Sequence, residues 1–196
     1  MSLISPAAAL RHVPRHERWF DTASTRWFGV PHPIRGWLDL PTSLTQRIAN
    51  HLGDPVRVRV LSERHDRLLA GERALLGIAG RNGRVREVQL EVRGTPYVVA
   101  RTVFADAAAR GANRGLRELG DRALGSLLFT SMRAPVVVRQ FASLTPRSSL
   151  WRALHTALPA DERHLWARRA VHNLRAQPLL VTEVFLPRLY AKPAAR

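Results

Sequence analysis

Hydrophobic and polar residues alternate along 84–103, a period typical of β-strands. Arg93 and Gly94 divide this stretch, which favours two strands joined by a two-residue hairpin loop. One residue on the otherwise apolar face of the first strand is charged, Arg86, and such a loop would place it directly opposite Arg101. Like charges opposite each other destabilise a sheet, and a buried guanidinium needs an anionic partner. The pattern therefore predicts an anion-binding site on this face of the sheet.

A second charged residue interrupts an apolar face in the strand predicted over 178–187. Glu183 falls at the same alternate positions as the large apolar residues of this strand. A carboxylate among apolar neighbours is costly unless it is paired; otherwise its pKa rises and it can donate a proton. Two interpretations stay open, a structural salt bridge with Arg86 or Arg101, or a group that transfers a proton in a reaction.

The clearest helix signal begins at Ser43. Ser43 followed by Gln46 three residues later is typical of a capping box, and Gly53 can end the helix. Between these signals the apolar residues recur at helical spacing on one face, namely Leu44, Ile48 and Leu52. We expect this stripe to pack on the predicted sheet.

The remaining pattern predicts further short elements. Alternation with period two predicts a strand over 56–60, a further strand is expected over 136–141, and 165–174 fits either a strand or the edge of a helix. Helices are predicted from Asp106 to about Glu118 and, as a helical hairpin, over 144–161. Strands joined by hairpins, together with these helices, indicate an α+β domain with an antiparallel sheet.

The composition limits the classes of function. At 196 residues, with 45% hydrophobic and 23% charged residues, the chain is long enough for one domain with a sizeable core. It has no cysteine, which excludes disulfides, thiolate nucleophiles and the common zinc fingers. The net charge of +16 suggests a nucleic-acid partner, but the arginines are scattered and Lys192 is the only lysine. Nucleic-acid binding is therefore not the expected role.

Residues 1–35 are rich in Pro, His, Arg and Trp without a sustained period, so we expect a partly ordered N-terminal extension. His12 and His16 stand four apart, but Pro14 disfavours the helix that would bring them together, and no metal site is predicted. The start of the chain has no basic n-region, and no apolar run approaches the roughly 18 residues of a membrane span. The expectation is a soluble cytoplasmic protein.

Six short blocks follow one another along 36–190. They are WLDLPTSLTQR (37–47), VREVQL (85–90), GTPYVVARTV (94–103), LGDRALGSLLF (119–129), LWARR (165–169) and PLLVTEVFLP (178–187). Each block alone has little specificity, but the set, in this order and with this spacing, resembles the chorismate pyruvate-lyase family. That family often has methionine where Leu44 stands, a change that conserves volume.

The resemblance implies a fold and a function. The domain would span 36–190 as a six-stranded antiparallel sheet with helices packed on it and helical flaps enclosing the ligand. A helical insertion would lie near 145–163, and a tail over 191–196. The family's reaction eliminates pyruvate from chorismate to give 4-hydroxybenzoate, the first committed step of ubiquinone biosynthesis. The chain is thus expected to be a monomeric lyase with a small-molecule substrate and product and without a metal or organic cofactor.

The resemblance also implies site residues. Arg86 matches the arginine that binds the ring carboxylate, and Glu183 matches the active-site glutamate, so these two are the expected catalytic residues. Leu44 and Leu124 match two flap positions that contact the ligand largely through backbone groups. Arg101 matches another arginine of the family's strand motif, and we expect it to help bind the second carboxylate of chorismate or to contribute to the electrostatic field around it.

A different class of function stays open, a non-catalytic domain that binds a small anion. The effector domains of some bacterial transcription regulators resemble this fold, and an anion site would serve a sensor equally well. Such a regulator needs a DNA-binding module, and residues 1–35 are too short and too rich in proline for a winged helix. Turnover of chorismate distinguishes the two readings.

Overall fold

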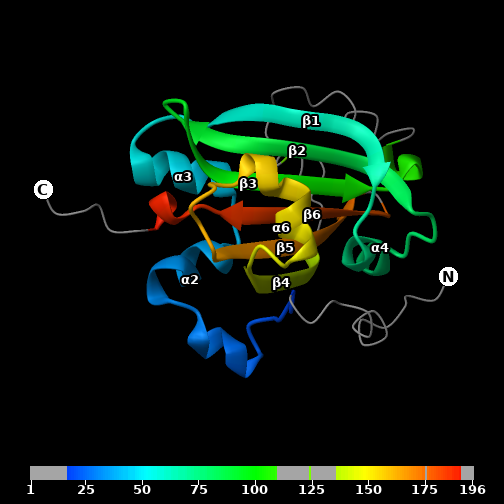
Figure 1. The fold of residues 1–196 in the computed structure, drawn as a ribbon, viewed down its shortest axis with the longest axis horizontal. Helices are drawn as coiled ribbons and strands as arrows, with labels where there is room; N and C mark the ends of the chain where they lie inside the picture. The colour runs from blue at the N-terminus through cyan, green and yellow to red at the C-terminus, as the bar shows by residue number, and fades with distance from the viewer. Residues whose placement is uncertain (1–16, 110–123, 125–135, 175, 191–196) are drawn as a thin grey trace, which may run out of the picture.

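Six strands form one antiparallel sheet in the computed structural model, in the order β1-β2-β3-β6-β5-β4 (Figure 1). The structure describes residues 17–109, 124, 136–174 and 176–190. The strands are β1 (Arg57–Arg67), β2 (Asn82–Val92), β3 (Thr95–Phe104), β4 (Val136–Leu144), β5 (Leu165–Leu174) and β6 (Gln177–Phe185). Every pairing is antiparallel, which confirms the expected six-stranded sheet.

Helices cover both faces of the sheet. The helices α2 (His32–Leu38) and α3 (Leu44–Leu52) bury apolar side chains against one face, here called the α3 face. The helices α4 (Ala70–Leu76) and α6 (Ser149–Leu154) pack on the opposite face, the α6 face. In Figure 1, α6 crosses in front of the central strands, and α3 lies behind the sheet. Short 3-10 helices complete the described part, namely η2 (Thr25–Gly29), η3 (Asp106–Ala109), η6 (His155–Ala157) and η7 (Pro187–Leu189).

The helix predicted from Ser43 is confirmed as α3. The Ser43 hydroxyl accepts a hydrogen bond from the Gln46 amide at 3.4 Å, and Gly53 ends the helix in the left-handed conformation with φ 74°. The reciprocal half of the capping box is replaced, because the Gln46 side chain donates to Asn50 at 2.9 Å. Leu44 and Ile48 are buried, as the apolar stripe predicted.

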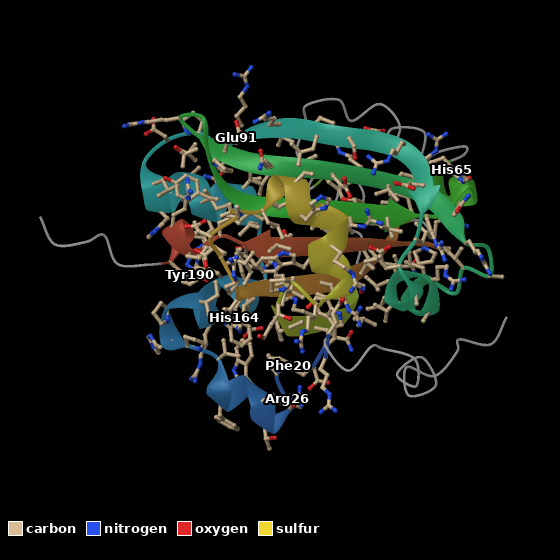
Figure 2. All side chains as sticks on the ribbon, viewed as in Figure 1. Phe20, Arg26, His65, Glu91, His164 and Tyr190 are labelled. Carbon is tan, nitrogen blue, oxygen red and sulfur yellow. The ribbon has the colours of Figure 1, made fainter. Side chains whose placement is uncertain are left out.

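Part of the predicted N-terminal extension packs on the sheet. Phe20 exchanges two backbone hydrogen bonds with Phe141 of β4, of 2.9 and 2.7 Å, and so forms an isolated bridge at the edge of the sheet (Figure 2). Val30 and Ile34 are buried in the core cluster on the α3 face. The sequence pattern of this region did not predict α2, because Pro31 and Pro33 obscure a helix that begins beside them.

Four sequence predictions are resolved or adjusted by the structure. The helical hairpin expected over 144–161 is one short helix, α6, followed by the 3-10 helix η6. The open choice for 165–174 resolves as strand β5, and the strand predicted over 56–60 extends to Arg67. The helix expected from Asp106 begins as η3, and its continuation lies outside the described residues.

The hairpin of β2 and β3 has the predicted loop but not the predicted register. Arg93 and Gly94 form the two-residue turn, with positive φ angles of 51° and 75°. A bulge follows at the step from Leu90 to Glu91 and shifts the pairing by one residue. The prediction that Arg86 lies opposite Arg101 is therefore wrong: because a one-residue slip moves a side chain to the other face, these two arginines point to opposite sides of the sheet.

Among the described residues, no helix combines the length and apolar character needed to cross a membrane.

Candidate active site

A pocket opens on the α3 face of the sheet. Its floor is formed by β2, β3, β6 and β5, and one wall by the segment from Leu40 to the start of α3. Of the five residues predicted from the sequence, four line this pocket: Leu44, Arg86, Leu124 and Glu183. The fold thus brings together residues that are as much as 139 positions apart in the chain, from Leu44 to Glu183.

Arg86 is a nearly buried cation of this pocket. It lies on β2, directly opposite Glu63 of β1, and its side chain is 3% exposed. Its Nη1 donates to Glu63 Oε2 at 2.9 Å, while the Glu63 side chain keeps 32% exposure. Because Glu63 remains in contact with water, it can orient the guanidinium without itself being buried. Further contacts also involve Arg86.

Glu183 is paired with Arg168, a residue that the sequence did not single out. The two lie directly opposite each other on β6 and β5. Arg168 donates from Nε to Oε2 of Glu183 and from Nη2 to Oε1 at 3.3 Å, and the two side chains are only 9% and 15% exposed. Glu183 does form a salt bridge, but the predicted partner, Arg86 or Arg101, is wrong: the partner is Arg168.

The same guanidinium ties the sheet to the pocket wall. Arg168 Nη1 donates to the backbone carbonyls of Trp37 and Leu40, both at 3.1 Å. Four hydrogen bonds thus come from one side chain, and they fix its position and that of the Glu183 carboxylate. Arg168 is best described as the residue that positions Glu183.

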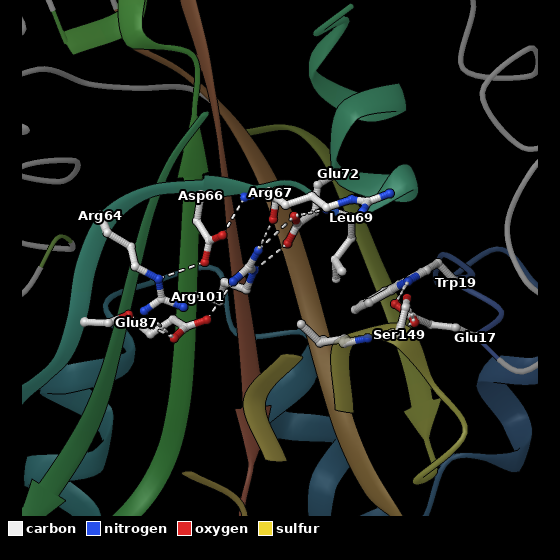
Figure 3. Close-up of polar contacts among 12 residues, drawn as sticks. Glu17, Trp19, Arg64, Asp66, Arg67, Leu69, Glu72, Glu87, Arg101 and Ser149 are labelled. Carbon is white, nitrogen blue, oxygen red and sulfur yellow. Dashed lines mark hydrogen bonds and ion pairs between the residues drawn. The ribbon is translucent and has the colours of Figure 1, made fainter. Parts of the chain in front are cut away.

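Arg101 lies outside the pocket, on the α6 face. Its Nε and Nη2 donate to the two carboxylate oxygens of Glu72 at 2.7 and 3.3 Å, and its Nη1 donates to Glu87 at 2.6 Å (Figure 3). Burial by itself lowers the pKa of Arg101, but the hydrogen bonds and charges of Glu72 and Glu87 raise it above its ordinary value. Arg101 is thus held by two carboxylates of its own face, so a direct contact with a ligand in the pocket is not available to it.

The two leucines lie in the pocket lining. Leu44 is the first residue of α3, directly after the cap Ser43, and its side chain is buried. The first turn of α3 faces the pocket through Ser43, Leu44 and Thr45, and a helix start favours negative charge. Leu124 lies at the pocket, but the rest of its block, 119–123 and 125–129, including Ser126, is outside the described residues.

Arg139 is a further cation of the pocket, also missed from the sequence. It lies on β4 with a side chain that is 27% exposed, and its ion pair with Asp39 is long, at 3.9 Å. Burial and then the charge of Arg168 lower the pKa of Arg139, while Asp39 and Glu183 counteract this effect. Among the described lining residues, three arginines accompany a single carboxylate, Glu183. Such a lining favours an anionic ligand.

Arg168 and Arg169, the adjacent arginines of the LWARR block, point to opposite faces of the sheet. Arg168 points to the pocket, while Arg169 lies over the Trp19 ring at 4.2 Å and donates twice to Gln140 Oε1, at 2.9 and 2.6 Å. Burial lowers the pKa of Arg169 to about 9. The sequence could have assigned these faces only if 165–174 had been recognised as a strand.

No group of three or more His, Cys, Asp or Glu side chains arranged for a metal ion occurs within the described residues.

The comparison with protein families bears directly on this pocket. The family model described as chorismate lyase matches residues 17–195. The chain belongs to the chorismate lyase family. It is 41% identical over 155 residues to a probable chorismate pyruvate-lyase of Dechloromonas aromatica, covering 79% of this chain and 86% of that protein. A probable chorismate pyruvate-lyase of Thiobacillus denitrificans is 38% identical over 167 residues, covering 83% and 87% of the two chains.

Solved structures share the fold of this chorismate lyase family member at low identity. PhnF from Mycobacterium smegmatis superimposes with a TM-score of 0.53 at 14% identity, covering 79% of this chain and 68% of that chain. The effector domain of PhnF gives a TM-score of 0.50, also at 14% identity, covering 74% and 88%. At this identity the likeness concerns the fold alone.

Proposed function

We propose that the protein eliminates pyruvate from chorismate to give 4-hydroxybenzoate, the ring precursor of ubiquinone. The observation that carries the proposal is that Arg86 and Glu183 line one pocket of a chorismate lyase family fold. They come from β2 and β6, which flank β3, so their Cα atoms are separated by about 12 Å, two strand spacings and one two-residue step. The substrate ring is proposed to bind in the pocket that both side chains line.

Arg86 is the proposed partner of the ring carboxylate. A guanidinium presents planar donors that match a carboxylate, and charge-assisted hydrogen bonds are strong in a site that excludes water. The side chain of Arg86 is nearly buried, and Glu63 holds it from the strand opposite. A charged group so fixed orients the substrate and requires little reorganisation during the reaction.

Glu183 is proposed to act at the other end of the ring. In the reaction the ether bond at ring carbon C3 breaks, its electron pair leaves with the enolpyruvate oxygen, and carbon C4 loses its hydrogen as a proton. Glu183, placed beside the C4 hydroxyl, is positioned to take part in this proton transfer. The enolpyruvate then takes up a proton at its methylene carbon and becomes pyruvate.

The reaction requires modest catalytic power. Loss of the proton and of enolpyruvate makes the ring aromatic, so the products are strongly favoured. The pocket then contributes mainly position and charge, with Arg168 holding Glu183 in place through two hydrogen bonds. The proposed mechanism uses only side chains of the protein itself.

The test is to incubate the purified protein with chorismate and to quantify both products. Equimolar 4-hydroxybenzoate and pyruvate, formed in proportion to the amount of protein, are the expected result. Retention of chorismate without turnover would instead support a non-catalytic anion sensor. Absence of both binding and turnover would contradict the proposal.

A further inference from the structure

We infer that Arg139 binds the second carboxylate of chorismate, the one on its enolpyruvyl group. This inference rests on the proposed function and names the residue that takes the place expected for Arg101. Chorismate is a dianion, so a pocket built for it needs a second cation as well as Arg86. Arg101 is excluded because Glu72 and Glu87 hold it on the α6 face.

The strand register places Arg86 and Arg139 at the two ends of one row across the sheet. Arg86 pairs with Thr102, Thr102 with Val181, Val181 with Ala170, and Ala170 with Arg139. The three residues between the arginines, Thr102, Val181 and Ala170, are small or of medium size, and all of them line the pocket. The row therefore forms a pocket floor with a cation at each end.

Glu183, the proposed proton-transfer group, lies beside this row. Ala100 pairs with Glu183 and Glu183 with Arg168, so these residues form the neighbouring row on the same face. Arg139 pairs with Ala170, two residues from Arg168 on β5, and the charges of Arg168 and Glu183 both influence the pKa of Arg139. A substrate whose ring lies between Arg86 and Glu183 would thus extend its enolpyruvyl group toward β4, where Arg139 lies.

The other pocket cation is less suited to this task. Arg168 already gives four hydrogen bonds, two to Glu183 and one each to the carbonyls of Trp37 and Leu40. Arg139 by contrast forms a single long ion pair of 3.9 Å among the described residues, with Asp39, whose side chain is 55% exposed. Exchange of that contact for a substrate carboxylate costs little, because Asp39 remains hydrated.

His172 also lines the pocket, but in the wrong row. It pairs with Leu179 of β6, so it lies one two-residue step beyond the row of Arg86 and two such steps from Glu183. A substrate held between Arg86 and Glu183 therefore lies farther along the strands, away from His172.

Two ligands of different charge test the inference. Chorismate carries the enolpyruvyl carboxylate, whereas 4-hydroxybenzoate retains only the ring carboxylate. In Arg139→Gln the KM for chorismate should rise about 10- to 100-fold, the loss expected for a hydrogen-bonded charge, while the inhibition constant of 4-hydroxybenzoate stays within about twofold. In Arg86→Gln both constants should rise. Arg139→Lys, which keeps the charge, should recover part of the loss.

The matched control is Arg152→Gln. Arg152 is exposed on α6, on the opposite face of the sheet, and the variant loses the same unit of charge. It should leave both constants unchanged, which excludes an effect of net charge alone. Circular dichroism and a urea unfolding curve establish that each variant is folded.

The outcomes separate the inference from the proposed function. A wild-type protein that gives no 4-hydroxybenzoate from chorismate overturns the proposed function, and the role of Arg139 with it. A wild-type protein that turns over, with Arg139→Gln equal to it in chorismate KM and kcat, overturns only the inference. Equal weakening of chorismate and 4-hydroxybenzoate by Arg139→Gln would also overturn it, because the second carboxylate would then not be the group recognised.

Discussion

Arg168 and Glu183 lie directly opposite each other on β5 and β6, and their side chains form an ion pair inside the pocket. The pair connects the stability of the fold to the proposed chemistry. Arg168 also joins the sheet to the backbone at Trp37 and Leu40, so one side chain holds both the Glu183 carboxylate and the pocket wall. Loss of Arg168 should therefore alter activity and stability together.

In Arg168→Met we expect the free energy of unfolding to fall by about 3 kcal/mol, because Glu183 is left as a largely buried charge without its partner. The kcat should fall as well, since the carboxylate loses its position. Urea unfolding and steady-state kinetics measure the two effects. The double variant Arg168→Met/Glu183→Gln should be less destabilised than the sum of the single variants. Strict additivity would show that the pair contributes no coupling energy.

Arg86→Ala should abolish turnover and the binding of 4-hydroxybenzoate while the protein stays folded. The ring carboxylate loses its main cation, whereas Glu63, which pairs with Arg86 in the wild-type protein, is 32% exposed and can be hydrated. Calorimetry with 4-hydroxybenzoate and the product assay measure these losses. Glu63→Gln serves as the control: it keeps the guanidinium but removes its charged partner, and its effect should be smaller. Normal chorismate turnover in Arg86→Ala would refute the assignment.

Glu183→Gln tests proton transfer separately from binding. The amide keeps the size of the carboxylate and can still accept a hydrogen bond from Arg168, but it cannot exchange a proton in the same way. We expect kcat to fall about 100-fold or more, the usual range for a general acid–base group, with a smaller change in KM. An unchanged kcat would leave Glu183 with a binding or structural role only.

Alternation within a single strand was enough to predict which face of the sheet a charged residue occupies. Arg86 and Glu183 were placed on the pocket side because each interrupts an apolar face of its own strand. Relations between strands were harder to predict. The bulge at Leu90–Glu91 has no marker such as glycine, and it alone moves Arg101 to the other face.

The partner of Glu183 was missed for a different reason. The LWARR block fits a strand or a helix edge, and only as a strand does it send Arg168 and Arg169 to opposite faces. Arg139 gives still less signal, since a single arginine in VVVRQF is equally compatible with an exposed position. Its place in the pocket depends on the order of six strands, which local pattern does not encode.

The stability at alkaline pH should depend on Tyr190. Burial, and then the charge of Glu162, raise the pKa of Tyr190 to about 12. Because this exceeds the unfolded value near 10, its stabilising contribution is complete below about pH 10 and is lost as the pH rises through about 12. Tyr190→Phe should reduce the fall in unfolding free energy over this window by about 1 kcal/mol, after allowance for solvent screening. Urea unfolding at both ends of the window measures it, and an equal fall in Tyr190→Phe and in the wild-type protein would contradict the prediction.

Arg101→Met should separate stability from ligand binding. Its removal leaves Glu72 and Glu87 as buried carboxylates without their shared partner, so the free energy of unfolding should fall by about 3 kcal/mol or more. The KM for chorismate should stay within about twofold of the wild-type value, because the side chain lies on the face opposite the pocket. If the variant does not fold, Arg101→Lys retains the charge and permits the same comparison. A large rise in KM with little loss of stability would instead indicate that Arg101 contributes to ligand binding.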